Sequence, residues 1–196
     1  MKRFVVVLLA VGAMILGLVP QAHAGGPFSG GIYDDFFNPD PVTPTIGQSV
    51  TWHNFGAVTH TATMIGPYKL FDTGNIPPGN NGLGVVNYAG TFPYECSIHL
   101  FKGTYAVADV VTPSTGPAST LFDVEWASNA PPPKNVFHVM EAVGGGAWTN
   151  LYKGKSGGFP VQFVSGTIHL RSRLESRLHP KKKHSGWSPT RDVVVT

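Results

Sequence analysis

The chain has 196 residues, of which 42% are hydrophobic and 13% are charged, and its formal net charge is +3. It contains 24 glycines and 17 prolines but a single cysteine, which excludes an internal disulfide. Its stability must therefore come from buried apolar surface, to which a bound metal would add by mass action.

The amino-terminal segment has the pattern of an export signal. Two basic residues precede an almost wholly apolar run over residues 4–19, and residues 22–24 (AHA) offer a cleavage site. The alternative, a membrane anchor, needs a longer run than this one, which Pro20 ends. We therefore predict a signal peptide at residues 1–24 and an exported protein that is secreted, periplasmic or at the cell surface. After cleavage, no apolar run is long enough for a transmembrane segment.

Residues 25–112 predict a set of short β-strands. Runs of β-branched and aromatic residues alternate with turn residues, and no long apolar pattern has a helical period. The expected strands cover residues 48–52, 84–88, 90–94 and 103–111. This pattern is typical of an all-β sandwich or barrel.

Residues 113–117 (PSTGP) predict a linker, because small polar residues and prolines favour an extended, exposed chain. A second β region follows in residues 118–196. Its expected strands cover residues 121–126, 135–142, 147–152, 161–164, 167–174 and 192–196. No internal repeat relates the two halves, so we expect two different β-sandwiches.

Charge divides unevenly between the halves. Residues 25–112 carry two basic and six acidic side chains, whereas residues 113–196 carry ten basic and five acidic ones. The basic half, with its tract at residues 181–184 (KKKH), suits an anionic cell-surface polymer, although a solvated loop gives the same pattern. Nucleic acid is not expected, because no aromatic residues interleave with the tract.

Three residues of the first half carry the chemistry. Cys96 and His99 stand three positions apart between two expected strands, and His60 lies 36 residues before the cysteine. One thiolate and two imidazoles form the trigonal set that holds copper in electron-transfer proteins. Zinc can use the same three donors, so the residue types alone leave the metal open.

Five blocks of the first half match a known family in order. They are residues 47–54 (GQSVTWHN), 59–63 (THTAT), 71–79 (FDTGNIPPG), 90–99 (GTFPYECSIH) and 102–107 (KGTYAV). Together they resemble a cupredoxin of the plastocyanin and amicyanin kind over residues 32–111. The resemblance implies a Greek-key sandwich with one copper ion at one end, cycling between Cu(I) and Cu(II). It also implies His60, Cys96 and His99 as the metal ligands.

The sequence departs from that family after the second histidine. The family usually has a methionine there as a weak axial ligand, but residues 99–103 (HLFKG) are one residue short and lack it. With Leu100 or Phe101 covering the axial side, a three-coordinate site should have a raised reduction potential. Alternatively, the shorter loop no longer aims His99, and the site is a relic. Met64 is expected to pack among apolar neighbours rather than to replace the missing ligand.

Four other residues near these blocks have supporting interpretations. Trp52 and Phe92 are expected in the core, and His53 is expected to be exposed or hydrogen-bonded. Asn54 is either a brace of the ligand loop, through hydrogen bonds to its backbone, or an ordinary turn residue.

The second half contains blocks at residues 122–126 (FDVEW), 137–141 (FHVME), 144–148 (GGGAW), 166–174 (GTIHLRSRL) and 185–189 (SGWSP). They resemble, more loosely, a fibronectin type III or similar immunoglobulin-like module. Alternation along the fourth block places Arg171 and Arg173 outward, where they can stack near Trp187. No carboxylate or cysteine stands at ligand spacing from the histidines of this half, which are expected to be isolated on the surface: His138, His169, His179 and His184.

The leading hypothesis is an exported one-electron carrier with a type 1-like copper site, which exchanges electrons with a redox partner protein and is not an enzyme. Cys96 would provide the electronic path, and the solvent-facing His99 would be the port. Two alternatives stay open. One is an extracellular interaction or adhesion module with vestigial metal binding, and the other is copper delivery or storage.

Overall fold

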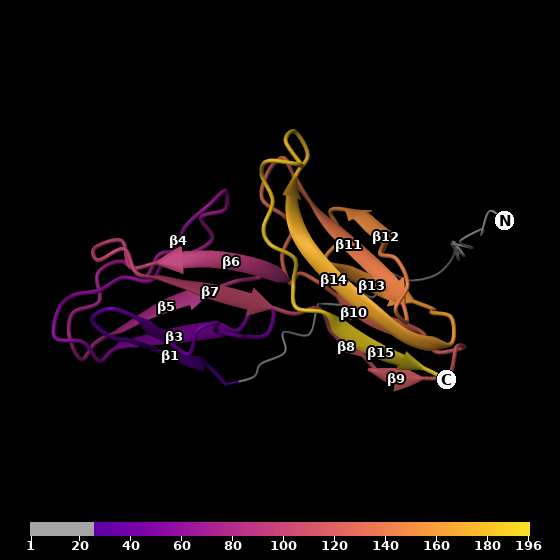
Figure 1. The fold of residues 1–196 in the computed structure, drawn as a ribbon, viewed down its shortest axis with the longest axis horizontal. Coiled ribbons are helices and arrows are strands. Elements are labelled where there is room, and N and C mark those ends of the chain that lie inside the picture. The colour runs from indigo at the N-terminus through magenta and orange to yellow at the C-terminus, as the bar shows by residue number, and fades with distance from the viewer. Residues whose placement is uncertain (1–25) are drawn as a thin grey trace, which may run out of the picture.

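The structure, a computed structural model, describes residues 26–196, and every regular element in that range is a β-strand. The all-β fold class predicted from the sequence is confirmed. Within the described range no helix is long and apolar enough to cross a membrane. The predicted signal peptide at residues 1–24 lies outside the described residues. Two groups of sheets lie end to end along the long axis of the molecule (Figure 1).

The first group is a sandwich of two sheets, in the orders β2-β1-β3-β5 and β4-β6-β7. Its strands are β1 (Phe28–Ile32), β2 (Phe37–Asn38), β3 (Ser49–Asn54), β4 (Thr63–Met64), β5 (Asn81–Val85), β6 (Gly90–Glu95) and β7 (Lys102–Val107). β1 pairs in parallel with β3, and the other pairs are antiparallel. The rings of Trp52 on β3 and Tyr94 on β6 lie 5.1 Å apart, so the two sheets pack face to face.

Alternation of side chains along β3 builds this core. Val50, Trp52 and Asn54 are buried, and the residues between them are partly exposed. The indole Nε1 of Trp52 donates to Tyr105 Oη on β7 at 3.1 Å, which satisfies a buried polar atom. A β-carbon on Gly30 of β1 would lie 2.5 Å from the Trp52 ring, so glycine is required beneath it. The core position predicted for Trp52 is confirmed.

The second group is also built from two sheets, in the orders β13-β10-β8 and β12-β11-β14-β15-β9. Its strands are β8 (Val110–Thr112), β9 (Thr115–Gly116), β10 (Phe122–Glu125), β11 (Asn135–Val143), β12 (Thr149–Gly154), β13 (Gly158–Val161), β14 (Gly166–Ser176) and β15 (Arg191–Val195). Trp126, which follows β10, and Tyr152 on β12 have ring centroids 5.2 Å apart. The two sheets therefore share an aromatic core.

The outer face of β14 carries a stack of cations and indole rings. β14 alternates buried and partly exposed residues as predicted, with Arg171 and Arg173 on the partly exposed face. The Arg171 guanidinium lies 4.0 Å from the Trp148 ring centroid and 4.6 Å from that of Trp187, and Arg173 lies 4.4 Å from Trp187. The predicted stacking near Trp187 is confirmed, and Trp148 extends it.

Two elements differ from the sequence prediction in the first half. The strand expected at residues 84–88 lies three residues earlier as β5, because it pairs with β3 from Ser49↔Val85 to His53↔Asn81. The strand expected at residues 103–111 is split into β7 and β8. Valines on both sides of the break favour one continuous strand, but Asp109 interrupts the alternation of Tyr105, Val107 and Val111 where the chain changes sheets.

The chain passes between the two groups earlier than the linker predicted at residues 113–117. β8 already belongs to the second group, since Val111 lies opposite Val124 of β10. Thr115 and Gly116 of the expected linker form β9 and pair in parallel with β15. The segment is therefore part of a sheet, because the backbone of β15 offers it hydrogen-bond partners that a linker would lack.

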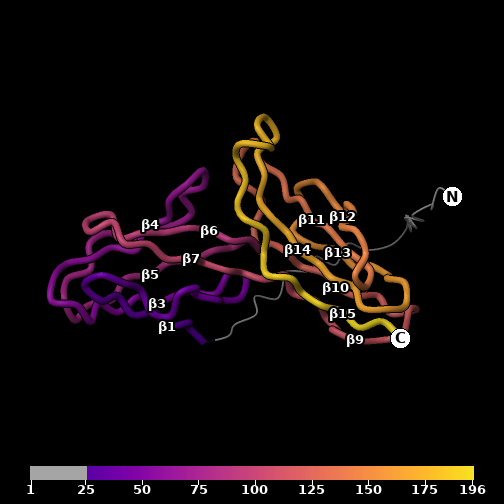
Figure 2. The backbone as a smooth tube through the Cα atoms, in the orientation of Figure 1, coloured from indigo at the N-terminus to yellow at the C-terminus, as the bar shows by residue number. Residues whose placement is uncertain are grey.

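Direct hydrogen bonds also join the two groups. Thr91 on β6 exchanges backbone hydrogen bonds with Gly186, at 3.1 and 2.9 Å, and its hydroxyl donates to the Trp187 carbonyl at 2.7 Å. Ala89 N–H donates to the Trp126 carbonyl at 2.8 Å. The segment after β14 runs along this junction before it enters β15 (Figure 2). The second sandwich is packed against the first and not merely connected to it.

Candidate metal centre

Two loops at the far end of the first sandwich carry the three predicted ligands. β6 runs away from the second half (Figure 1), and Cys96 follows its last residue, with His99 in the same loop before β7. His60 lies in the segment between β3 and β4. The fold thus brings together side chains that are 36 positions apart in the sequence.

The donor atoms of these residues form a small triangle. Cys96 Sγ lies 3.6 Å from His60 Nδ1 and 3.6 Å from His99 Nδ1, and the two nitrogens are 3.1 Å apart. A point equidistant from the three atoms is about 2 Å from each, close to the length of metal–imidazole and metal–thiolate bonds. Within residues 26–196, no other three histidine, cysteine or carboxylate side chains converge in this way. The donor set fits a single metal ion.

His60 is held in place by backbone bonds and by Asn54. His60 and Ile76 exchange backbone hydrogen bonds at 3.1 and 2.8 Å. Asn54, buried at the end of β3, donates from Nδ2 to the carbonyls of Val58 and Ile76, both at 2.8 Å. Its Oδ1 accepts from the Gly56 N–H at 2.8 Å. Of the two roles considered for Asn54, the structure shows the brace.

Asp34 contacts His60 directly, although no sequence pattern points to it. Its Oδ1 accepts from His60 Nε2 at 3.2 Å and from the Ala57 N–H at 2.8 Å, and these bonds, the first above all, lower the pKa of the Asp34 carboxyl. We assign the ring hydrogen to Nε2, which leaves a lone pair on Nδ1 facing Cys96, as a metal ligand requires. A β-carbon on Gly56 would lie 2.8 Å from Nε2, so a larger residue would disturb this pair.

The backbone of the cysteine loop closes on itself. The Leu100 N–H donates to the Cys96 carbonyl at 2.7 Å, and the Cys96 N–H donates to the Phe101 carbonyl at 3.0 Å. Leu100 has a φ of 65°, a left-handed conformation that lets the short loop turn back toward β7. The shortened loop therefore aims His99 at the other two donors, which agrees with the first of the two alternatives and not with a misdirected His99.

Thr61 ties the two ligand loops together, although no sequence pattern reveals this role. It follows His60 and is almost fully buried. Its Oγ1 accepts from the Ser97 N–H at 2.9 Å and lies 3.0 Å from Ser97 Oγ, while the Thr63 hydroxyl donates to it at 3.1 Å. The residue after one ligand is thus bonded to the residue after another, which fixes the spacing of the loops.

An aromatic side chain packs against the ligands in place of a methionine. The Phe101 ring centroid lies 5.4 Å from that of His60 and 6.5 Å from that of His99. Leu100 is 65% exposed. Met64 is buried in the hydrophobic core, as predicted. Of the two residues expected to cover the site, Phe101 is the one in contact with the ligand rings.

The remaining interpretations in the first half are confirmed. His53 lies on the partly exposed face of β3, with its Nδ1 2.7 Å from Asn81 Oδ1. Phe92 is buried in the core. Neither residue belongs to the triangle of donor atoms.

Two histidines of the second half are not isolated as expected. His138 Nδ1 lies 3.1 Å from a Glu175 oxygen, and His169 Nδ1 lies 2.6 Å from an Asp192 oxygen. These partners come from neighbouring strands of one sheet, so sequence spacing does not show them. Burial is the largest influence on His138 and lowers its pKa despite the nearby carboxylate. His179 is exposed, and His184 Nδ1 lies 2.8 Å from the Ser185 carbonyl.

Comparison with known proteins yields similarities of fold. No protein-family model matches the sequence, and no curated protein matches it. A purple cupredoxin from Nitrosopumilus maritimus is 23% identical over 41% of this chain and 99% of its own, with a TM-score of 0.39. An amicyanin variant in its Cu(I) state is 20% identical over 43% of this chain and 84% of its own, with a TM-score of 0.38. A cytokine receptor complex is 14% identical over 76% of this chain and 92% of its own, with a TM-score of 0.34.

Proposed function

We propose that the chain is an exported copper protein that carries one electron at a time, with His60, Cys96 and His99 as the metal ligands. The observation that carries this proposal is the convergence of one sulfur and two nitrogen atoms within 3.6 Å of one another. Bound copper would supply a one-electron couple between Cu(I) and Cu(II). The proposal assigns no substrate turnover to the chain.

The number of donors favours copper over structural zinc. Structural zinc sites are almost always closed by four protein ligands, whereas a trigonal set of two histidines and one cysteine suits copper. Among the residues that the structure describes, no fourth histidine, cysteine or carboxylate joins the cluster. The donor set therefore supports the copper proposal.

Burial suggests different roles for the three ligands. Cys96 and His60 have no exposed surface, which keeps water away from the thiolate. His99 is exposed, and the exposed apolar side chains of Ile98 and Leu100 lie beside it in the loop. An exposed ligand edge within apolar surface suits a redox partner protein, because docking there buries apolar surface and removes few polar groups from water. We assign the His99 edge as the contact for that partner.

The decisive experiment is a titration of the copper-free chain with Cu(II), followed by visible absorption and electron paramagnetic resonance. We expect an intense thiolate-to-copper charge-transfer band that saturates at one equivalent. The band should disappear in Cys96→Ser and persist in His53→Ala, whose imidazole lies outside the donor triangle. Free copper at about 100 times its Kd should also raise the free energy of unfolding by about 2.7 kcal/mol.

Two results would contradict the proposal and favour the alternatives. If the folded chain fails to bind copper in either oxidation state, an interaction module with vestigial metal binding becomes the better description. If the chain binds Cu(I) tightly but the bound copper does not cycle reversibly, copper delivery or storage becomes the better description.

A further inference from the structure

A cavity lies where the two sandwiches meet. It has a volume of about 450 Å³ and is lined from both halves, by residues 67–70 of the first and by residues 132–135, 176, 178, 179 and 183 of the second. Tyr68 joins the two sides, since its hydroxyl donates to the Lys183 carbonyl at 3.1 Å. Burial raises the pKa of Tyr68 to about 12, so this hydroxyl keeps its proton. We call this space the junction cavity.

The lining of the junction cavity is cationic. Lys69, Lys134 and Lys183 contribute three ammonium groups, His179 contributes an imidazole, and no carboxylate lines the cavity. These lysines are exposed, and none forms an ion pair with a carboxylate of the described residues. Three unpaired cations around one concave surface attract anions more strongly than scattered surface charges do.

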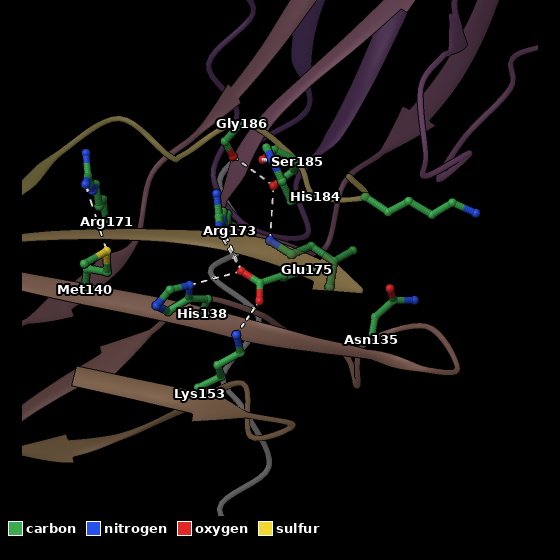
Figure 3. A network of polar contacts seen from close by, with 12 residues as sticks. Asn135, His138, Met140, Lys153, Arg171, Arg173, Glu175, His184, Ser185 and Gly186 are labelled. Atoms are coloured by element: carbon green, nitrogen blue, oxygen red, sulfur yellow. Dashed lines mark hydrogen bonds and ion pairs between the residues drawn. The ribbon is translucent and has the colours of Figure 1, made fainter. Parts of the chain in front are cut away.

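The nearest buried carboxylate does not neutralise this surface. Glu175 is 1% exposed, and Lys153, Arg173 and His138 all bond to its oxygens (Figure 3). Burial alone would raise the Glu175 pKa, but these three hydrogen bonds outweigh it and lower the pKa. The carboxylate is occupied by its own partners, which leaves the lysines of the junction cavity available to a ligand.

The backbone at Lys134 turns at the wall of the junction cavity. Lys134 has a φ of 65°, in the left-handed region that glycine and asparagine favour. The Arg177 N–H donates to its carbonyl at 2.9 Å and holds this conformation. This turn sets the course of the chain between Pro133 and β11, where Lys134 lines the junction cavity.

A second cavity extends the cationic surface. It has a volume of about 410 Å³ and shares Ser176 with the junction cavity; Lys153, Lys155 and Arg177 line it, together with the one carboxylate of Glu175. The loop after β14 lends residues to the lining of both cavities and projects beyond the sheets (Figure 2). Two adjoining cationic cavities suit a ligand with repeated negative charges better than a single small anion.

We infer that the junction cavity binds the acidic groups of an anionic polysaccharide, carboxylate or sulfate. Its walls include Pro67, Leu70 and Leu178, apolar surfaces against which sugar rings can pack. The one aromatic residue of the lining, Tyr68, is buried and presents no stacking platform. Single-stranded nucleic acid depends on such platforms, so a polysaccharide fits this surface better.

The test compares the full chain with two double variants that lose the same charge. Lys134→Gln/Lys183→Gln removes two cations from the junction cavity, and Lys181→Gln/Lys182→Gln removes two from the same loop region outside the lining. Binding of polygalacturonate, which carries carboxylates, and of heparin, which is rich in sulfates, is measured at several salt concentrations. We expect the cavity variant to lose about five- to tenfold in affinity and the control about twofold or less. The slope of log affinity against log salt should also become shallower in the cavity variant.

Two single substitutions, one of a cavity lysine and one of a control lysine, test the contribution of the first half. Lys69→Gln should weaken binding, whereas Lys102→Gln, an exposed lysine on β7 outside the cavity, should not. Thermal unfolding of each variant checks that its fold is intact. Binding of only one polymer, with the expected variant dependence, supports the proposal and identifies the acidic group.

Three outcomes would overturn the proposal. These are no binding of either polymer, equal losses in the cavity and control variants, and binding of a single-stranded DNA oligonucleotide that is as tight and as sensitive to the cavity lysines. The last outcome would assign the surface to nucleic acid. The experiment uses the copper-free chain, so its result does not depend on the metal site.

Discussion

At the scale of single residues, the contact between Asp34 and His60 is the feature that should most directly affect which oxidation state of a bound metal is favoured. A carboxylate that accepts a hydrogen bond from the remote nitrogen of a ligating imidazole makes that imidazole a stronger donor. It also favours the more highly charged metal ion, Cu(II), over Cu(I). The side chain of Asp34 is 54% exposed, so solvent and salt screen part of this effect.

Asp34→Asn keeps the shape of the side chain and removes its charge. We expect the affinity for Cu(II) to fall by about tenfold and the affinity for Cu(I) to fall less, so the reduction potential rises. Chelator competition in both oxidation states and spectroelectrochemistry measure these changes. Asp35→Asn is the matched control, because Asp35 is the exposed neighbour of Asp34 and lies outside the bonds to His60. Equal shifts of the reduction potential in the two variants would mean that it responds to the long-range charge alone and not to the hydrogen bond to His60.

The three candidate ligands were predictable from the sequence, whereas Asp34 was not. The chain has a single cysteine, and the Cys-x-x-His spacing places it in one loop with a histidine. Asp34 stands 26 residues before His60 in a stretch without a metal-binding pattern. Parallel pairing of β1 with β3 brings it to the site, and that pairing is long-range. Local pattern therefore identifies the donors but not the groups that orient them.

At the scale of elements, the end of β3 controls the loop that carries His60. Asn54 closes β3, and its amide bonds two backbone carbonyls, those of Val58 and Ile76. Removing the buried amide takes the donor from the Val58 carbonyl and the acceptor from the Gly56 N–H, and it leaves the Ile76 carbonyl with the His60 N–H alone. The loss affects both segments that flank His60, because Ile76 is also its backbone partner.

Asn54→Ala should lower the free energy of unfolding by about 2–3 kcal/mol and weaken metal binding. Urea unfolding of the copper-free chain measures the first effect, and copper titration measures the second. Asn81→Ala is the control, since Asn81 is exposed and bonds only the side chain of His53 among the side chains described. We expect it to change stability by less than about 0.5 kcal/mol. A stable Asn54→Ala that binds copper normally would show that the brace is dispensable.

Element positions follow from alternation where a strand keeps to one sheet. β6 and β14 lie close to their predicted ranges because buried residues recur at every second position over most of their length. β11 also lies close to its predicted range, although a register shift between Val139 and Met140 interrupts its alternation. Val107, Val110 and Val111 favour one continuous strand, and the mark of the break between β7 and β8 is Asp109, a charged residue where the alternation requires an apolar one. β9 has the composition of a linker, since the glycine and prolines around it favour loops when no partner strand is known.

At the scale of the whole molecule, the candidate metal centre and the junction cavity are separate: residues of both sandwiches line the cavity, and none of the three candidate ligands does. The cysteine loop follows β6, which runs away from the second sandwich (Figure 1). This separation allows one surface to meet a redox partner while the other holds a polymer. Such an arrangement requires the two sandwiches to stay packed, and Asp109 lies at the crossing between them.

Asp109 is buried between β7 and β8, where the chain changes sheets. Its Oδ2 accepts from the Ser188 hydroxyl at 3.2 Å, and Oδ1 has no partner among the described residues. Burial raises its pKa to about 7, although the hydrogen bond from Ser188 opposes this effect. In the unfolded chain the carboxyl titrates near the ordinary aspartate pKa of 3.8. Its contribution to stability is therefore complete below about pH 4 and is lost as the pH rises toward 7.

Asp109→Asn should remove this pH dependence, because the amide does not ionise. From pH 4 to 7.5, the free energy of unfolding of the parent chain should fall relative to the variant by up to about 4 kcal/mol. Urea unfolding at several pH values measures the difference, which cancels the titration of all other groups. Asp123→Asn, at an exposed position of β10, is the control: the difference in free energy of unfolding between the parent chain and this variant should not change with pH over the same range. A parent and an Asp109→Asn variant whose stabilities change in parallel with pH would show that the junction accepts the charged carboxylate.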